Sequence, residues 1–526
     1  MITDVLPGVS VAVVPPAPEQ DVLRTDVAVL LGRTRRGPLG AAVRVQGWAE
    51  FQRWYGPDDP AAATPAAVRG FFENGGRTAW VVRVAGAGTA GAAADWVIDD
   101  PVPPGFGYGR YRIVATSPGT WANNTRVRVR YQASSVAGPA AVSFRITTPG
   151  EPTESFAALP PESIVDRLAG SALIRLVPVG PPLDRTRPAR TPAPLVRDWL
   201  AVLGGGAEEP PTADDYLAAG ELQATLPEPA LVGLPDLTDD LPDPVLTETV
   251  LALLALVHDG QDRLLVLDVP TAPAGPAPLT AQIALRGGGP EPSGLSADAA
   301  VDWVAGLRAL GDDALLGCAA VYHPRIQIPA EPGRLRTLPA TGHVLGLIAR
   351  LDGERGPHHT PANAALLEAV DLDPRFPSAQ EARLFDGGVN LLRGLPGRGL
   401  VVWGGRTLAT GAGARYVAHR RLLYQLVRAI RRVADPLVFE TNSPELRLAL
   451  VRGITSVLLA AYRAGALVGA RPEEGFQVVC DDTNNPPGQP PEQVVCDVSV
   501  APAAPMEFIR IRVVLGQDRG LEVLEA

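Results

Sequence analysis

The stretch from Arg415 to Leu467 constrains the fold of this chain more than any other segment. Its first part, RYVAHRRLLYQLVRAIRRVADP, predicts a helix, because six apolar residues lie within an arc of about 140° when residues are set about 100° apart. They are Leu422, Leu423, Leu426, Val427, Ile430 and Val433. An arc of about 120° on the opposite side holds Arg420, Arg421, Arg428, Arg431 and Arg432. Such a helix buries its apolar face in a core and presents the arginines outward.

The outward arginines have two interpretations. A charged helix face is usually a solvated surface, and the alternative is a contact surface for an acidic partner. After this helix the sequence predicts a short apolar strand, LVFE (437–440). A second helix is predicted in SPELRLALVRGITSVLLAAYRAGAL (443–467).

The chain is long enough for several domains and is acidic overall. Its 526 residues suit two to four domains at about 150 residues each. With 46% hydrophobic and 20% charged residues, the composition is typical of a soluble globular protein with a large core. The net charge of −10 argues against nonspecific binding to nucleic acid or to an anionic membrane, because both require a positive field.

The expected compartment is a reducing cytoplasm. Three cysteines are too few for a disulfide scaffold, and no pair has CxxC spacing. The start, MITDVLPGVSVAVVPP, lacks the features of a secretory signal, and the most apolar run (251–257) is far shorter than the ~20 residues of a membrane span. Cys480 and Cys496 flank a turn-rich connection; a disulfide between them is geometrically possible, but two thiols are expected in a reducing compartment.

The N-terminal segment predicts a short strand on a linker. In PGVSVAVV (7–14), Val9, Val11 and Val13 share one face, and a Pro-Pro pair ends the pattern. Such a strand either folds back on its own domain or adds to a sheet edge of a neighbouring molecule. An α/β unit follows, with buried strands at 27–32 and 77–84 that flank two helices, 47–56 and 60–76.

A GxGxxG pattern at Gly86, Gly88 and Gly91 directly follows the second of these strands. A dinucleotide site needs a helix that starts at the glycines, and only about ten residues remain before Asp99-Asp100-Pro101. The glycines are therefore expected to form a flexible linker between domains, and no cofactor is expected.

Between 105 and 225 the sequence predicts an inserted β-rich domain. YRIVATS, TRVRVRYQ and AVSFRITT alternate like antiparallel strands, whereas 149–225 has weak periodicity and predicts an irregular tail. From about 230, strands such as RLLVLDVP (263–270) and LLGCAAVYHP (315–324) alternate with helices, which predicts a parallel or mostly parallel sheet.

Side chains at the strand ends and in one loop raise the question of catalysis or metal binding. Asp268 and His323 end two strands and could line a crevice, but no nucleophile elbow or P-loop accompanies them, so Asp268 is expected to be a strand-end hydrogen-bond acceptor. His358 and His359 are adjacent, and their side chains are expected to diverge on an extended backbone. A metal site would need a third ligand nearby. We expect neither a catalytic nor a metal site.

In their order along the chain, a series of segments resembles the tail sheath family of contractile injection systems, which includes contractile phage tails, tailocins and related particles. The resemblance covers nearly the whole length. It departs from the family pattern at 149–225 and at GPHHTP. The segments that carry it are PGVSVAVV, VAVLLGRTRRGPLGAAVRVQGWAEF, VRGFFENGGRTAWVVRV, SPGTWANNTRVRV, RLLVLDVP, AAVYHPRIQI, GHVLGLIARLDGERGPHHTPAN, GVNLLRGLPGRGLVVWGGRTLA, LVFETNSPELRLALVRGI and GARPEEGFQVVCD.

The resemblance implies a multidomain subunit of mixed α/β (α+β) fold. Its parts would be an exchange strand (1–16), an inner α/β assembly domain from both chain ends (17–100 and 339–526), an inserted β-rich domain (101–228) and a middle α/β domain (229–338). It also implies a structural protein rather than an enzyme, without cofactor or metal. Copies would stack as six-subunit rings around an inner tube, and contraction would drive the tube through a target envelope.

The resemblance further implies partners and contact residues. Besides other copies, the partners would be the inner tube and the baseplate and terminal cap proteins, with assembly in the bacterial cytoplasm and no contact with nucleic acid or insertion into a membrane. The terminal strands are expected to join a neighbour's sheet through Val9, Val11, Val13, Phe508, Ile509, Ile511 and Val513. The five arginines of the 415–434 helix become candidate contacts to an acidic tube surface, in competition with a subunit interface or plain solvent.

Two other classes of protein stay open. An α/β enzyme would use the GxGxxG glycines or Asp268 and His323, and would bind nucleotide saturably. A carbohydrate- or surface-binding module would use the β-rich insertion. Neither explains the strands at both chain ends, and hollow, striated tubes in negative-stain electron microscopy would decide for the sheath.

Overall fold

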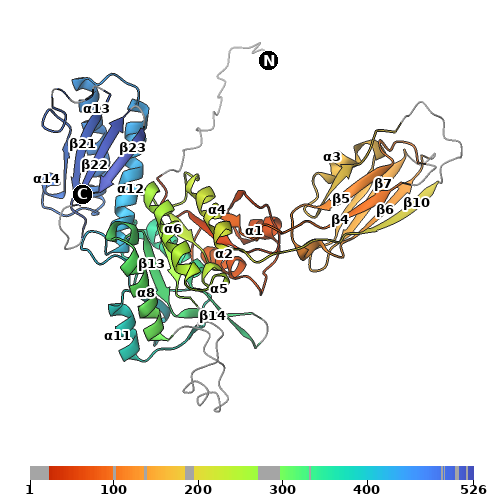
Figure 1. Cartoon of the computed structure of the whole chain (residues 1–526), viewed down its shortest axis with the longest axis horizontal. Helices are drawn as coiled ribbons and strands as arrows, with labels where there is room; N and C mark the ends of the chain where they lie inside the picture. Colours follow the sequence, from red (N-terminus) through yellow and green to blue (C-terminus); the bar gives the residue numbers. More distant parts are fainter. Residues whose placement is uncertain are drawn as a thin grey trace, which may run out of the picture.

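The computed structural model shows three groups of elements, each with its own hydrophobic core. Figure 1 shows a central body, a β-rich unit that stands apart from it, and a C-terminal unit beside helix α12. The mixed helix-and-sheet character predicted from the sequence is confirmed. The structure describes residues 23–98, 102–134, 139–183, 195–270, 296–330, 333–486, 488, 490, 492–503, 509–516 and 519–525.

A nine-stranded sheet forms the centre of the body, in the order β16-β19-β18-β13-β12-β11-β1-β3-β2. Six strands, from β3 to β18 in that order, pair in parallel, and β2, β19 and β16 are antiparallel at the edges. The mostly parallel sheet predicted from residue 230 onward is confirmed. The bounds are β1 Ala28–Gly32, β2 Ala42–Val45, β3 Ala79–Arg83, β11 Leu231–Gly233, β12 Leu264–Asp268, β13 Ala319–His323, β16 Ala364–Ala365, β18 Asn390–Leu395 and β19 Gly399–Trp403.

This sheet joins segments that the sequence analysis assigned to different domains. Strands β1 and β3 come from 17–100, β11 to β13 from 229–338, and β18 and β19 from 339–526. The physical reason is that a parallel pair needs no short connection, so distant segments can be neighbours in one sheet. The domain boundaries themselves stay a prediction.

Helices cover both faces of the central strands. As a result, every residue of β1, β12 and β13 is buried. Two helix pairs pack on it, α2 with α10 and α4 with α6. The body also contains a three-stranded sheet, β15-β14-β17, and the helices α1, α5, α8, α9 and α11. The bounds are α1 Trp48–Tyr55, α2 Ala63–Glu73, α4 Ala213–Ala224, α5 Leu237–Asp240, α6 Val245–Gly260, α8 Ala297–Leu310, α9 Asp313–Leu316, α10 Thr341–Arg355, α11 Ser378–Asp386, β14 Arg325–Pro329, β15 Leu335–Leu338 and β17 Asp371–Asp373.

Two buried aspartates hold the starts of α2 and α10. Asp236, shortly after β11, accepts hydrogen bonds from the Ala63 N–H (2.6 Å) and the Thr64 hydroxyl (2.6 Å). Asp268, the last residue of β12, accepts one from the Ala340 N–H (2.7 Å). These bonds satisfy helix-start donors that lack a partner within the helix. The strand-end acceptor role predicted for Asp268 is confirmed.

Helices α2 and α10 cross in close contact through glycines. A Cβ atom on Gly342 would overlap the backbone of Ala67, and one on Gly70 would overlap the ring of His343. Because glycine has no Cβ, the two backbones can approach this closely. The His343 side chain is enclosed at this crossing, and burial lowers its pKa to about 4.

His343 is expected to make the fold acid-sensitive. The unfolded chain binds a proton at this residue near pH 6.5, whereas the folded chain does so only near pH 4. The contribution of a neutral His343 to stability is therefore complete above pH 6.5 and is lost as the pH falls toward 4. The expected loss at pH 5 is about 2 kcal/mol of unfolding free energy.

This loss is measured by urea unfolding at pH 7 and pH 5. A His343→Gln variant should lose less stability between these pH values than the wild type, even if it is less stable at pH 7. His359→Gln, at an exposed position, is the control and should keep the wild-type difference. Equal pH dependence in wild type and His343→Gln would contradict the assignment.

The β-rich unit packs two sheets around aromatic side chains. The sheets have the orders β10-β6-β7-β8 and β4-β5-β9. Trp96 lies at the centre, with ring centroids of Phe106, Tyr111, Phe144 and Trp199 between 5.3 and 5.9 Å away. The bounds are β4 Ala93–Val97, β5 Arg110–Ala115, β6 Arg126–Gln132, β7 Ala141–Thr147, β8 Glu154–Leu159, α3 Ile164–Leu168, β9 Ile174–Pro178 and β10 Val196–Val202.

The irregular tail predicted for 149–225 is wrong. Strands β8, β9 and β10 complete the two sheets, and α4 packs with α6 on the central body. Strand β10 pairs with β6, about 70 residues earlier in the sequence. Long-range pairing of this kind stabilises segments whose local pattern is weak.

The GxGxxG glycines lie in the connection between the β-rich unit and the body. The Gly86 N–H donates to the Glu209 carbonyl oxygen (3.0 Å), and Ala90 and Ala207 exchange two backbone hydrogen bonds (2.9 and 3.0 Å). Strand β4 follows the glycines, and no helix starts there. The position between domains agrees with the predicted linker, and the helix that a dinucleotide site requires is not formed in these described residues.

Beside α12, the C-terminal unit contains the long helix α13, the short helix α14 and a four-stranded sheet, β20-β21-β22-β23. The strand predicted for LVFE is wrong: its first residue ends a 3-10 turn, and Phe439 has a left-handed φ of 76° and is 86% exposed. The second helix starts as predicted, with the Ser443 hydroxyl accepting from the Leu446 N–H. The bounds are α12 Val417–Ala434, η3 Asp435–Leu437, α13 Pro444–Arg463, α14 Pro472–Gly475, β20 Phe476–Val479, β21 Val494–Val500, β22 Ile509–Gly516 and β23 Arg519–Glu525.

Candidate functional site

Helix α12 joins the central body to the C-terminal unit, and we treat this junction as the candidate functional site. Val417 and Tyr424 belong to the core of the central body. The leucine-rich side belongs to the core of the C-terminal unit, through Leu422, Leu423, Leu426, Val427 and Ile430. One helix therefore takes part in two cores, so that it links the two units (Figure 1).

Arg421 fastens α12 to helix α10 by a buried ion pair. Its Nη1 donates to Oδ1 of Asp352 (2.6 Å), and its Nη2 donates to Oδ2 of the same carboxylate. Nη2 also donates to the carbonyl oxygen of Thr25 (3.0 Å), just before β1. The side chains of both partners are 3% exposed. Burial raises the pKa of Asp352, and the guanidinium opposes that shift. A two-fold contact of this kind fixes orientation as well as distance.

Arg428 lies about two helical turns after Arg421 and binds backbone carbonyl oxygens. It donates to the carbonyl oxygens of Arg24 (3.1 Å), Glu228 (3.0 Å) and Pro229, which precede strands β1 and β11. These carbonyl groups come before the first paired residues of the two strands. The side chain is buried, and this burial lowers the pKa of Arg428 to about 10, a value at which the guanidinium remains charged at neutral pH.

Further contacts continue along the same edge of the sheet. Arg431 donates to the Gly260 carbonyl oxygen (2.7 Å), shortly before β12. The Tyr424 hydroxyl donates to the sulfur of Cys318 (3.1 Å), directly before β13. Arg420 donates to the Tyr424 hydroxyl (3.1 Å). Helix α12 thus crosses the amino-terminal ends of four neighbouring parallel strands.

The prediction of an outward-facing arginine stripe is wrong for three of its five members. Arg420, Arg421 and Arg428 are between 1% and 3% exposed, so they do not form an outer surface for an inner tube in this conformation. Arg431 is half-buried and Arg432 is exposed. The helical wheel separated two chemical faces correctly, but it could not tell water from backbone carbonyl oxygens as the partner of the guanidinium groups. Tube contact by Arg431 and Arg432 stays a prediction.

The sequence did not reveal which groups accept the hydrogen bonds of these arginines. Asp352 is the one available signal, because it is the only acidic residue in the predicted helix GHVLGLIARLD. The carbonyl oxygens of residues 24, 25, 228, 229 and 260 carry no sequence signal, since every residue has one.

The predicted exchange strands lie partly within the described residues. Ile509, Ile511 and Val513 lie in β22, which pairs with β21 and β23 of the same chain. Phe508 and the N-terminal Val9, Val11 and Val13 lie outside the described residues. Exchange of strands between copies stays a prediction.

The histidine pair differs from its prediction. The rings of His358 and His359 do not diverge, since their centroids are 4.2 Å apart. The cause is local: these residues form a turn rather than an extended segment. In the described part of the chain, no group of three histidine, cysteine or acidic side chains could hold a metal ion.

Cys480, Cys496 and the strand-end residue His323 are all buried. Cys480 and Cys496 are buried free cysteines, as expected. His323 is buried beside the ring of Phe376, with centroids 5.3 Å apart. None of the helices in the described residues combines the length and the hydropathy needed to cross a membrane.

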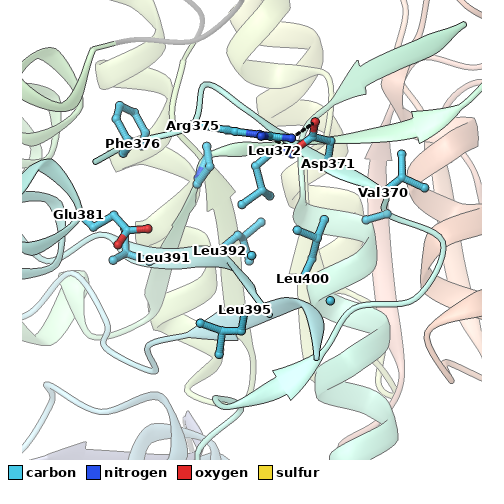
Figure 2. A pocket seen from close by; sticks show the side chains of 14 residues that line it. Val370, Asp371, Leu372, Arg375, Phe376, Glu381, Leu391, Leu392, Leu395 and Leu400 are labelled. Carbon is cyan, nitrogen blue, oxygen red and sulfur yellow. Dashed lines mark hydrogen bonds and ion pairs between the residues drawn. The ribbon is translucent and has the colours of Figure 1, made fainter. Parts of the chain in front are cut away.

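A cavity of about 430 Å³ lies between β17, β18 and α11. Figure 2 shows leucines from several elements around it, with the Asp371–Arg375 ion pair at one side. The guanidinium is bound at 2.5 and 2.8 Å to that carboxylate. The cavity is lined mainly by aliphatic side chains and offers no arrangement of nucleophile and base.

Part of this chain is similar in sequence to tail sheath proteins. Residues 317–408, which include β13 to β19, match a family model described as the phage tail sheath protein central domain. The tail sheath protein of Vibrio phage KVP40 is 30% identical over 186 residues, and that of Enterobacteria phage T4 is 29% identical over 187 residues. Each alignment covers 34% of this chain and 27% of the phage protein. The chain thus matches about a quarter of the length of these relatives.

The similarity in fold extends over almost the whole chain. The sheath tail protein of Listeria innocua has a TM-score of 0.62 at 12% identity, covering 94% of this chain and 96% of that one. The sheath tail protein of Desulfitobacterium hafniense has a TM-score of 0.60 at 15% identity, covering 97% and 100%. The helical sheath of the anti-feeding prophage in its contracted state has a TM-score of 0.52 at 20% identity, covering 97% and 98%. The resemblance to the tail sheath family is confirmed.

Proposed function

We propose that this tail-sheath chain is the structural subunit of a contractile injection particle. Copies polymerise as stacked six-subunit rings around an inner tube, and contraction drives the tube through a target envelope. The anti-feeding prophage sheath, to which the fold is similar, is known in a contracted state. The protein acts as a mechanical part and not as an enzyme. Its other partners are the baseplate and terminal cap proteins of the particle, and assembly takes place in the cytoplasm.

The observation that carries the proposal is the α12 junction. A subunit that moves as a body must transmit force from the unit bound to its neighbours to the rest of the chain. Helix α12 provides this transmission, because its apolar side is enclosed in one core and its arginines bind the other. Ion pairs and hydrogen bonds that are buried need to break together before the two units separate.

Connection between copies is assigned to the terminal strands. In the described residues, β20 and β23 are the edges of the C-terminal sheet, and an edge strand offers unpaired backbone donors and acceptors to an added strand. We assign the N-terminal segment of a neighbouring copy to such an edge. Main-chain hydrogen bonds hold the strand, and the linker after it leaves the angle between copies free to change during contraction.

Deletion of residues 1–16 is expected to abolish polymerisation and leave folded, soluble protein. The wild-type chain should form hollow, striated tubes in negative-stain electron microscopy, and the truncated chain should not. A variant with a Gly-Ser segment of equal length in place of 1–16 controls for chain length and should behave like the deletion. Normal tubes from either variant would refute the exchange, and a wild-type chain that stays a monomer under all conditions would refute the sheath.

A further inference from the structure

Charge is strongly segregated along the sequence. Between residues 198 and 262 there are fourteen acidic residues and no arginine or lysine. The preceding part, 105–197, has twelve arginines and five acidic residues. The net charge of −10 is therefore the sum over a basic segment, a strongly acidic segment next to it, and the rest of the chain. Asymmetry of this kind favours interaction between oppositely charged surfaces.

The basic segment forms an arginine face on the β-rich unit. In β6 the buried residues alternate with exposed arginines at 126, 128 and 130. Arg145 in β7 is directly opposite Arg128 and is also exposed. We call these four residues the arginine face. Like charges directly opposite each other on a sheet are destabilising, so the fold tolerates a repulsion that an anionic partner would relieve.

Within the described residues, the arginine face has a single acidic partner, Asp198. In the described residues, the one ion pair of this face joins Arg130 and Asp198 at 3.8 Å, with both side chains more than 60% exposed. An exposed pair at this distance contributes little. Within the same residues, no acidic side chain pairs with the other three arginines.

The acidic segment forms a second surface on the central body, on helices α4 and α6. These helices pack together, and their exposed sides carry Asp214, Glu221, Glu248 and Asp259. We call these four residues the acidic face. Residues seven or eleven apart lie on the same side of an α-helix, because 3.6 residues make one turn. None of the four forms an ion pair in the described part of the chain, whereas the buried Asp236 and the half-buried Asp240 are bound to Arg33.

The two faces match in size. Arg126 and Arg130 are about 14 Å apart along β6, at about 3.4 Å per residue. Glu248 and Asp259 are about 16 Å apart along α6, and Asp214 and Glu221 about 10 Å apart along α4, at 1.5 Å per residue. Rows of opposite charge with similar lengths can lie against each other with several contacts at once.

Within one chain, the two surfaces belong to separate units. Figure 1 shows the β-rich unit standing away from the body that carries α4 and α6, joined to it by a narrow connection. We infer that the arginine face docks on the acidic face of a second copy of this chain. This contact deepens the proposed sheath function by naming a surface between copies. Two different surfaces of one chain make a head-to-tail contact, which produces closed rings or open helical stacks.

The test uses charge reversal on the full chain. The first variant, Arg126→Glu, Arg128→Glu and Arg145→Glu, has two acidic surfaces. The second, Glu221→Arg, Glu248→Arg and Asp259→Arg, has two basic surfaces. All six positions are exposed, so both variants should keep the wild-type thermal unfolding curve. Sedimentation velocity at 50 and 500 mM salt measures assembly, and electron microscopy identifies tubes.

Each variant alone is expected to lose at least tenfold in the fraction of assembled protein at low salt. An equimolar mixture of the two should recover association, because each then meets its opposite charge. High salt should weaken the recovery, since charges in water are screened beyond about 10 Å at 0.1 M.

Three results would overturn the inference. They are wild-type assembly by each variant alone, loss of assembly in the first variant but not in the second, and a mixture that stays dissociated. The second of these would indicate another anionic partner for the arginine face, such as the tube or an acidic polymer. The proposed sheath function fails separately: a wild type without tubes, combined with association of the two variants, would leave this contact standing and remove the sheath.

Discussion

Replacing Arg421 by Met is expected to lower the free energy of unfolding by about 3–5 kcal/mol, the range observed when one member of a buried ion pair is removed. The variant leaves the Asp352 carboxylate buried without its partner, and the Thr25 carbonyl oxygen loses a donor. Because the bonds join α12 to the central body, the loss should appear first as separation of the two units. Urea unfolding measures the free energy, and limited proteolysis near α12 detects the separation.

The same helix offers a matched control. Arg432 is exposed, so Arg432→Met should change stability by no more than about 0.5 kcal/mol. In the double variant Arg421→Met with Asp352→Leu, most of the loss should return, since no uncompensated charge is left. Equal losses in Arg421→Met and Arg432→Met would show that the buried pair has no special role. Reversing Arg421 or Arg428 to Glu would disturb the fold and therefore could not test tube contact; Arg432→Glu can.

Replacing Gly342 by Ala is expected to destabilise the chain by about 3 kcal/mol, at the upper end of the usual cost of overpacking. The added methyl group would overlap the carbonyl oxygen and Cα of Ala67 in the facing helix. These atoms belong to the backbone of α2, so the strain can be relieved only by moving the whole helix. The displacement would spread to β1, on which α2 packs.

Helix α10 itself contains the control for this prediction. Gly353 has no atom within 4 Å of the place where a Cβ would lie. Gly353→Ala should therefore stabilise the helix by up to about 1 kcal/mol, because alanine has the higher helix propensity. The two substitutions make the same chemical change, and their effects should have opposite signs. Thermal or urea unfolding measures the stability change of each variant. A similar small effect at both positions would contradict the close crossing of α2 and α10.

Much of the fold was predictable where the local pattern was strong. The buried strands near 28–32, 79–83 and 264–268 and the helices at 341–355 and 417–434 correspond to runs with clear periodicity. The predictions failed where the pattern was weak or misleading. Strands β9 and β10 were missed because their pairing partners, β5 and β6, lie far along the chain. Strand β8 pairs with the neighbouring β7 and was missed because its local pattern is weak. The LVFE strand was predicted wrongly because a short apolar run does not specify a conformation.

That α12 has an apolar side and a cationic side follows from the order of its side chains, because this order sets both faces of a helix. What each side contacts depends on how the whole chain folds. The guanidinium groups of Arg421 and Arg428 bind a carboxylate and backbone carbonyl oxygens at the ends of parallel strands. These acceptors come from segments up to about 400 residues away, and carbonyl groups are identical in every residue. Which group accepts a buried hydrogen bond therefore depends on the packing of the whole chain. It cannot be read from the sequence of one helix.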